Sequence, residues 1–177
     1  MALEKSIYEL SIKELKAFLN VNNLSSELSS TIFRNLYKKN KHEQPISKKI
    51  MTLLEKNFNL SLPKIIMVSK SDDGTVKFLI EFLDGKSVET VLIPFHKRFT
   101  VCLSSQVGCA MKCSFCYTGT MGLSRHLKSS EIIGQFIVAS NYLEEELGMK
   151  TMQPNIVFMG QGEPLHNSDE VLKAIEI

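Results

Sequence analysis

Apolar residues return every three or four positions through the first part of the chain, a spacing that is typical of amphipathic helices. Stripes of this kind lie at residues 15–19, 28–36 and 50–54. Ser11 and Glu14 precede the first stripe at the spacing of a capping box, in which each side chain satisfies a free backbone amide. The pattern therefore predicts three short helices that bury their apolar faces against one another.

From Lys64 onward the pattern becomes that of β-strands. Residues 64–69, 75–83 and 87–94 are rich in β-branched, aromatic and other apolar side chains. Turn sequences that contain Asp-Gly separate the three runs, which is typical of hairpins. This segment is predicted to form a small antiparallel sheet that follows the helices.

A strand, a loop, a helix and a second strand come next. Residues 99–103 predict a strand, residues 129–147 a long helix that Gly148 ends, and residues 155–159 another strand. Two strands that are joined in this way by a helix run parallel. Because active-site loops lie at the carboxyl ends of parallel strands, the cysteine loop after the first strand and the loop at 160–164 should face each other.

The four cysteines gather in one segment. Cys109, Cys113 and Cys116 have the spacing C-x3-C-x2-C, and Cys102 lies shortly upstream. Thiolates are soft ligands that suit iron–sulfur clusters and zinc, and a set of three leaves one metal position open for a substrate. A structural zinc site with Cys102 or His126 as its fourth ligand is an alternative, as are buried or disulfide-bonded cysteines.

Composition changes this picture little. Hydrophobic residues make up 44% of the chain and the formal net charge is +2, so charge alone does not indicate a nucleic-acid binder. No stretch approaches the length of a transmembrane helix and no signal peptide is recognisable, so we expect no membrane and a cytoplasmic protein. One basic run could contact phosphates or be a solvated surface: Lys38, Lys39, Lys41, His42, Lys48 and Lys49.

The sequence around the cysteines resembles the RlmN/Cfr family of radical S-adenosylmethionine enzymes, which methylate adenosine carbons in 23S ribosomal RNA. The longest matching run covers residues 100–122, with Phe115 before the last cysteine. Further matches lie at residues 88–94, 130–135 and 158–165, in the order that the family has.

The resemblance implies an α/β fold and three domains. Residues 1–60 would be a small helical accessory domain and a candidate RNA-binding domain. Residues 61–98 would be an antiparallel β linker region. Residues 99–177 would be the N-terminal part of a radical SAM (β/α) partial TIM barrel, truncated and therefore incomplete.

The resemblance also implies two cofactors, a [4Fe–4S] cluster and S-adenosyl-L-methionine. Cys109, Cys113 and Cys116 would be the metal ligands for the cluster. Gly162 and Glu163 belong to a G-E-P motif that would bind the amino group of S-adenosylmethionine. On the residues alone, this motif also fits an ordinary turn between a strand and a helix.

Two residues receive catalytic roles from the same resemblance. Glu89 would take the proton from the substrate carbon, and Cys102 would resolve the protein–RNA crosslink by forming a disulfide. On sequence pattern alone, Glu89 is instead a solvent-facing strand residue. The expected product is methylated at C2 of adenine, with a C8-methylating relative as an alternative. Transfer RNA is a second candidate substrate, and a flavodoxin-type protein is the expected electron donor.

One observation sets a limit on this interpretation. The family carries its methyl group on a cysteine near the C-terminus, and the sequence has no cysteine after Cys116. We therefore expect the chain to be the N-terminal half of such an enzyme, unable to complete methylation alone. A zinc-binding RNA-interaction module is the alternative from another functional class.

Overall fold

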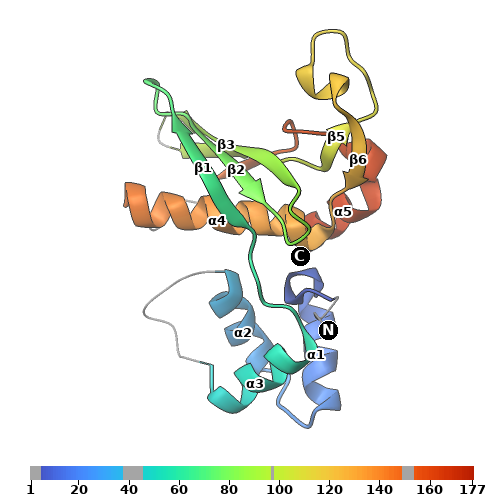
Figure 1. The fold of residues 1–177 in the computed structure, drawn as a ribbon. Helices are drawn as coiled ribbons and strands as arrows, with labels where there is room; N and C mark the ends of the chain where they lie inside the picture. Colours follow the sequence, from blue (N-terminus) through green and yellow to red (C-terminus); the bar gives the residue numbers. More distant parts are fainter. Residues whose placement is uncertain (1–4, 38–45, 97, 149–153) are drawn as a thin grey trace. The chain divides into compact units, whose positions relative to one another are not determined.

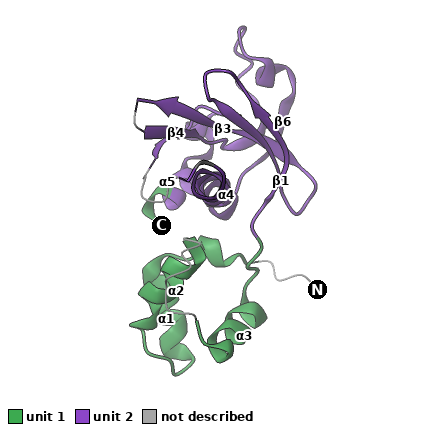
Figure 2. Ribbon diagram, turned by 90° about the vertical axis from the view of Figure 1, so that its left-hand side faces the viewer, with its two compact units in different colours: residues 1–61, 175–177 green, residues 62–174 purple. Residues whose placement is uncertain are grey.

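The computed structural model describes residues 5–37, 46–96, 98–148 and 154–177. The chain divides into two compact units, shown in Figure 2. Unit 1 comprises residues 1–61 with 175–177, and unit 2 comprises residues 62–174. In the part of the chain that the structure describes, no helix is long and apolar enough to cross a membrane.

Unit 1 contains the three predicted helices, α1 (Ile12–Val21), α2 (Leu28–Tyr37) and α3 (Lys48–Asn57), after a short 3-10 helix η1 (Ile7–Glu9). The predicted capping box is confirmed. Glu14 N donates to Ser11 Oγ at 3.2 Å, and Ser11 N donates to Glu14 Oε2 at 2.8 Å.

The predicted basic run of unit 1 is only partly visible. Lys38, Lys39, Lys41 and His42 lie outside the described residues. Lys48 and Lys49 are exposed in the first turn of α3. The interpretation of this run as a phosphate-binding surface stays a prediction.

Unit 2 is built on a five-stranded sheet of order β1-β2-β3-β4-β7 (Figure 1). Strands β1 to β4 are antiparallel neighbours, and β7 pairs with β4 in parallel. These strands confirm both the predicted antiparallel sheet and the predicted parallel pair. Their bounds are β1 Lys64–Lys70, β2 Val76–Glu81, β3 Ser87–Phe95, β4 Arg98–Cys102 and β7 Asn155–Val157.

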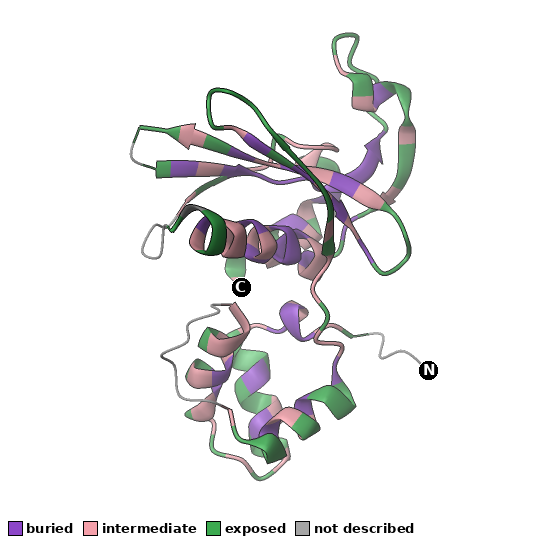
Figure 3. Cartoon of the chain, turned by 60° about the vertical axis from the view of Figure 1, so that its left-hand side comes forward, coloured by how far each residue is buried: buried purple, intermediate pink, exposed green. Residues whose placement is uncertain are grey.

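Helix α4 (Ser129–Leu147) covers one face of this sheet, where the buried residues gather in Figure 3. Along β3, Val88, Thr90 and Leu92 are buried and their neighbours are not, so the two faces of the strand differ. Gly148, at φ +67°, ends α4 as predicted. The core joins α4 to the sheet: Phe78, Ile80, Val88, Leu92, Val101, Ile132, Ala139 and Leu143.

A second, two-stranded sheet carries the cysteine segment and was not predicted. Strands β5 (Gln106–Cys109) and β6 (Gly122–His126) pair antiparallel, and the 3-10 helix η2 (Tyr117–Thr120) lies in the loop between them. Strand β5 has four residues, and apolar and polar residues do not alternate along it, so its sequence does not predict a strand. The chain continues after β7 into η3 (Pro164–Asn167) and α5 (Ser168–Glu176).

Candidate metal and cofactor site

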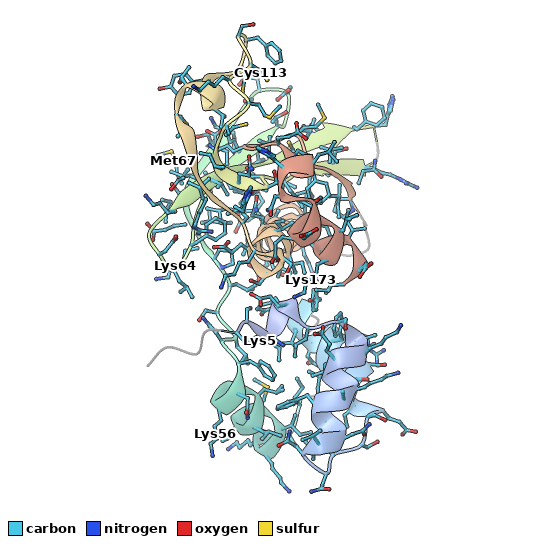
Figure 4. All side chains as sticks on the ribbon, turned by 90° about the vertical axis from the view of Figure 1, so that its right-hand side faces the viewer. Lys5, Lys56, Lys64, Met67, Cys113 and Lys173 are labelled. Carbon is cyan, nitrogen blue, oxygen red and sulfur yellow. The ribbon has the colours of Figure 1, made fainter. Side chains whose placement is uncertain are left out.

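The cysteine loop projects from the end of β5. Cys109 is the last residue of that strand and is buried, whereas Cys113 is exposed and Cys116 is half-buried. Figure 4 labels Cys113 on this loop. All four cysteines of the chain are free thiols. Local hydrogen bonds shape the loop, such as Cys116 N to Cys113 O at 3.1 Å.

The structure does not bring the three thiols together. Within the described ranges, no group of three or more His, Cys, Asp or Glu side chains is arranged to hold a metal ion. The donor chemistry nevertheless fits a soft metal or an iron–sulfur cluster. Backbone N–H groups of Gly119 and Thr118 and the Thr118 hydroxyl lower the pKa of Cys116, which favours the thiolate that binds metal.

The loop after β7 lies against the segment that leads into β5, as the parallel strands predicted. Gly160 N donates to Leu103 O at 3.1 Å, and Ser105 N donates to Gln161 O at 2.8 Å. Ser104 Oγ also accepts from Gln161 N at 2.9 Å. The G-Q-G-E-P loop and the start of the cysteine segment are therefore joined by backbone and side-chain hydrogen bonds.

Gly162 makes this close approach possible. It has φ +98°, a conformation that strongly favours glycine, and a Cβ at this position would lie 2.5 Å from Gln106 Cβ. Glu163 N, the next amide, donates to Gln106 Oε1 at 2.9 Å. The glycine of the motif is thus required by packing against β5 as well as by its backbone conformation.

Gly162→Ala is expected to lower the free energy of unfolding by about 2–4 kcal/mol, because it combines a positive φ with a collision against a buried side chain. Gly85→Ala is the matched control, since Gly85 also has a positive φ, +76°, but no atom lies within 4 Å of its added Cβ. Urea unfolding of both variants measures the difference. Equal losses would show that the contact with Gln106 contributes nothing.

The two predicted catalytic residues lie on the same face of the five-stranded sheet. Cys102 is directly opposite Val91 in the β3–β4 pair, and Glu89 is two residues before Val91. Side chains related in this way point to one face and are diagonal neighbours, about 7–8 Å apart. This face is opposite the one that α4 covers, because Val88 and Thr90 beside Glu89 belong to the helix-facing side.

Glu89 and Cys102 differ in their surroundings. The Glu89 carboxylate is 44% exposed, and its Oε1 lies 2.9 Å from Lys77 Nζ on β2. The Cys102 thiol is buried, and loss of solvent raises its pKa, although a hydrogen bond from the backbone of Met159 opposes the shift. The sheet thus places the Glu89 carboxylate and the buried Cys102 thiol on its open face, which is the face opposite α4. Both lie near the end of β4 that leads into the cysteine loop.

A buried polar network behind Glu89 was missed by sequence reasoning. Gln135 Oε1 on α4 accepts from Thr90 Oγ1 at 2.8 Å and from Ser104 N at 2.9 Å, and all three residues are fully buried. Ser104 Oγ in turn donates to Glu89 O at 2.6 Å. A polar residue on the apolar side of a predicted helix, beside Ile132 and Phe136, is the signal that could have identified it.

Arg125 on β6 holds the cysteine hairpin to two other elements. Its guanidinium donates to both carboxylate oxygens of Glu131 on α4 at 2.8 Å, and to Asp84 Oδ2 at 2.7 Å. It also lies over the ring of Phe82, 5.6 Å from the centroid. Hydrogen bonding to Arg125 lowers the pKa of Asp84, and hydrogen bonding to Glu131 raises that of Arg125.

Arg125→Met should therefore cost about 2 kcal/mol in unfolding free energy, since it leaves Glu131 largely buried without its bidentate partner. Arg98→Met, at an exposed position of β4, is the control and should change stability by about 0.5 kcal/mol or less. Thermal and urea unfolding compare the two variants. A loss for Arg125→Met no larger than that of the control would contradict this assignment.

No protein-family model matches the chain. A "dual-specificity RNA methyltransferase RlmN" from Bdellovibrio bacteriovorus is 38% identical over 97% of this chain and 43% of its own length. A probable enzyme of the same name from Clostridium botulinum is 37% identical over 98% of this chain and 49% of its own length.

Two further matches agree with these. The RlmN of Oleidesulfovibrio alaskensis is 47% identical over 73% of this chain and 36% of its own length. The crystal structure of a radical SAM methyltransferase from Sphaerobacter thermophilus superposes with a TM-score of 0.87 at 33% identity, over 98% of this chain and 51% of that one. The chain thus spans about half the length, or less, of the relatives it matches.

Proposed function

Because the chain belongs to the RlmN family of radical S-adenosylmethionine methyltransferases, we propose that it supplies the cluster-binding and donor-binding half of an enzyme that methylates C2 of an adenine in RNA. The substrates would be 23S ribosomal RNA and, in line with the dual specificity in the relatives' names, transfer RNA. One observation carries the proposal: hydrogen bonds join the segment leading into the cysteines to the G-Q-G-E-P loop, at the carboxyl ends of two parallel strands.

The proposed cofactor ligands come from these two segments. Cys109, Cys113 and Cys116 would hold a [4Fe–4S] cluster, which leaves one iron without a protein ligand. Gly162 and Glu163 would bind the amino group of S-adenosylmethionine. When bound, the cluster supplies the electron that cleaves the sulfonium of S-adenosylmethionine and starts radical chemistry. A flavodoxin-type protein is the proposed source of that electron.

Two residues on the open face of the sheet would act on the RNA. Glu89 would accept the proton from the adenine carbon. Its Oε1 lies 2.9 Å from Lys77 Nζ, which stabilises the ionised carboxylate. The Cys102 thiol would resolve the covalent link between protein and RNA. The Ser104 hydroxyl donates to the backbone carbonyl of Glu89, and Ser104 N donates to the buried Gln135 side chain. The strand that carries Glu89 is therefore fixed by the Gln135 network.

Reductive cleavage of S-adenosylmethionine tests the proposal on this chain. After anaerobic loading with iron and sulfide and reduction by dithionite, the chain should convert S-adenosylmethionine to 5′-deoxyadenosine. Glu163→Gln should weaken binding of the donor by about tenfold, because an amide replaces the carboxylate that faces its ammonium group. A loaded chain that neither binds nor cleaves the donor would refute the proposal.

Methyl transfer to RNA is expected to need more than these 177 residues. The reaction of the family needs a further cysteine that carries the methyl group. The four cysteines of the sequence all lie between residues 102 and 116, and each already has a proposed role in the cluster or in resolving the crosslink. We therefore expect the purified 177-residue chain to form no methyladenosine in RNA. Methyladenosine detected by mass spectrometry of RNA treated with the chain alone would contradict this.

A further inference from the structure

The buried side chain of Gln106 connects Glu163 of the proposed donor-binding loop to the hairpin that carries the cysteines. Gln106 is the first residue of β5, three positions before Cys109, and it is fully buried. Its Oε1 accepts from Glu163 N at 2.9 Å. Its Nε2 lies 3.0 Å from Nδ1 of His126, the residue opposite it on β6.

The contact with Glu163 determines the orientation of the Gln106 amide. A backbone N–H can only donate, so the atom facing Glu163 must be the carbonyl oxygen. The NH₂ group of Gln106 therefore faces His126, and His126 Nδ1 must accept.

Other contacts reach this region without making the same connection. Asn167 Nδ2 donates to Ser105 O and Leu127 O, at 2.9 and 2.8 Å, and neither of these hydrogen bonds goes to Gly162 or Glu163. Ser104 reaches the loop at Gln161 and not at Glu163. Gln106 alone among these contacts both receives the Glu163 amide and fills the space that a Gly162 side chain would need.

We propose that Gln106 is a positioning residue, which fixes the backbone of Gly162 and Glu163 relative to the cysteine hairpin. This inference rests on the proposed function, since it assigns to Gln106 the alignment of the amine-binding loop with the cluster ligands. Gln106 touches neither cofactor in this assignment. It acts through the Glu163 amide on one side and through His126 on the other.

Two substitutions of Gln106 distinguish a role in positioning the Gly162–Glu163 backbone from a role in the stability of the fold. Gln106→Met keeps the length of the side chain but loses the acceptor for Glu163 N–H. Gln106→Glu keeps the acceptor for Glu163 N–H, and its second carboxylate oxygen can accept from a protonated Nδ1 of His126. Asn167→Leu is the matched control, because it removes a buried amide of the same region whose hydrogen bonds go to Ser105 O and Leu127 O and not to Glu163 N.

Hydrogen exchange of the Glu163 amide in the chain without cofactors is the first measurement. Exchange should be about tenfold faster in Gln106→Met, whereas Gln106→Glu and Asn167→Leu should stay within about threefold of the wild-type chain. In Gln106→Glu, nitrogen NMR should show a proton on His126 Nδ1, the atom that accepts from Gln106 in the wild-type chain. A Glu163 amide that exchanges equally slowly in Gln106→Met would overturn the proposal.

Binding of S-adenosylmethionine to the loaded chain is the second measurement. Gln106→Met should bind the donor about tenfold more weakly at an unchanged iron content, and Gln106→Glu should restore binding. If Gln106→Met binds as tightly as the wild type, the positioning role is wrong and the proposed function stands. If the wild-type chain binds no donor, the proposed function fails, and the exchange measurement alone decides what Gln106 fixes.

Discussion

Cys113→Ala is expected to abolish assembly of the iron–sulfur cluster, leaving a colourless chain after anaerobic treatment with iron and sulfide. With three protein ligands for four irons, the loss of one thiolate leaves two irons without a protein ligand. Cys113 is exposed, so its replacement should leave the free energy of unfolding almost unchanged. Iron and sulfide analysis, with the visible spectrum, measures the effect.

Cys102→Ala is the control that distinguishes a three-cysteine cluster from a zinc site with Cys102 as a ligand. Cys102 lies on the open face of the sheet and has no proposed role as a ligand, so its removal should leave iron and sulfide at the wild-type level. A zinc site that uses Cys102 as its fourth ligand makes the opposite prediction. Loss of metal in both variants would therefore contradict the three-cysteine assignment.

Gln135→Leu should reduce the free energy of unfolding by about 3–5 kcal/mol, the largest stability effect that we expect of a single substitution in this chain. Leucine fills a similar volume but leaves the Thr90 hydroxyl and the backbone N–H and C=O of Ser104 without their partners. Each buried group left unsatisfied costs about 1–3 kcal/mol.

Ser140→Ala on the same helix is the matched control. The Ser140 hydroxyl is buried and has no hydrogen-bond partner among the described residues, so removing it should change stability by less than about 0.5 kcal/mol. Urea unfolding of both variants gives the comparison. If Gln135→Leu cost no more than Ser140→Ala, the network would not stabilise the strand that carries Glu89.

The regular part of the fold could be predicted because its burial is periodic. Strand β3 alternates between buried and open positions, and the Asp-Gly turns mark where its neighbours begin. The parallel pairing of β4 with β7 followed from the long intervening helix. That pairing in turn predicted that the G-Q-G-E-P loop would face the cysteine loop, and hydrogen bonds join it to the segment that leads into the cysteines.

The connections that hold the site together could not be predicted in this way. Gln106 and Gln135 bond to groups dozens of residues away, and only the folded register brings those partners within reach. The β5–β6 hairpin was not predicted, because Gly108 and the cysteines interrupt any alternation of apolar and polar residues. The spacing of the cysteines also predicted one loop around one metal, whereas the three side chains do not converge here.

Anaerobic reconstitution of the wild-type chain, followed by iron, sulfide and zinc analysis, tests the central claim most directly. A chain that builds the proposed site should hold about four irons and four sulfides and be brown. A colourless chain that retains zinc in preference to iron, or that binds neither metal, would contradict the claim.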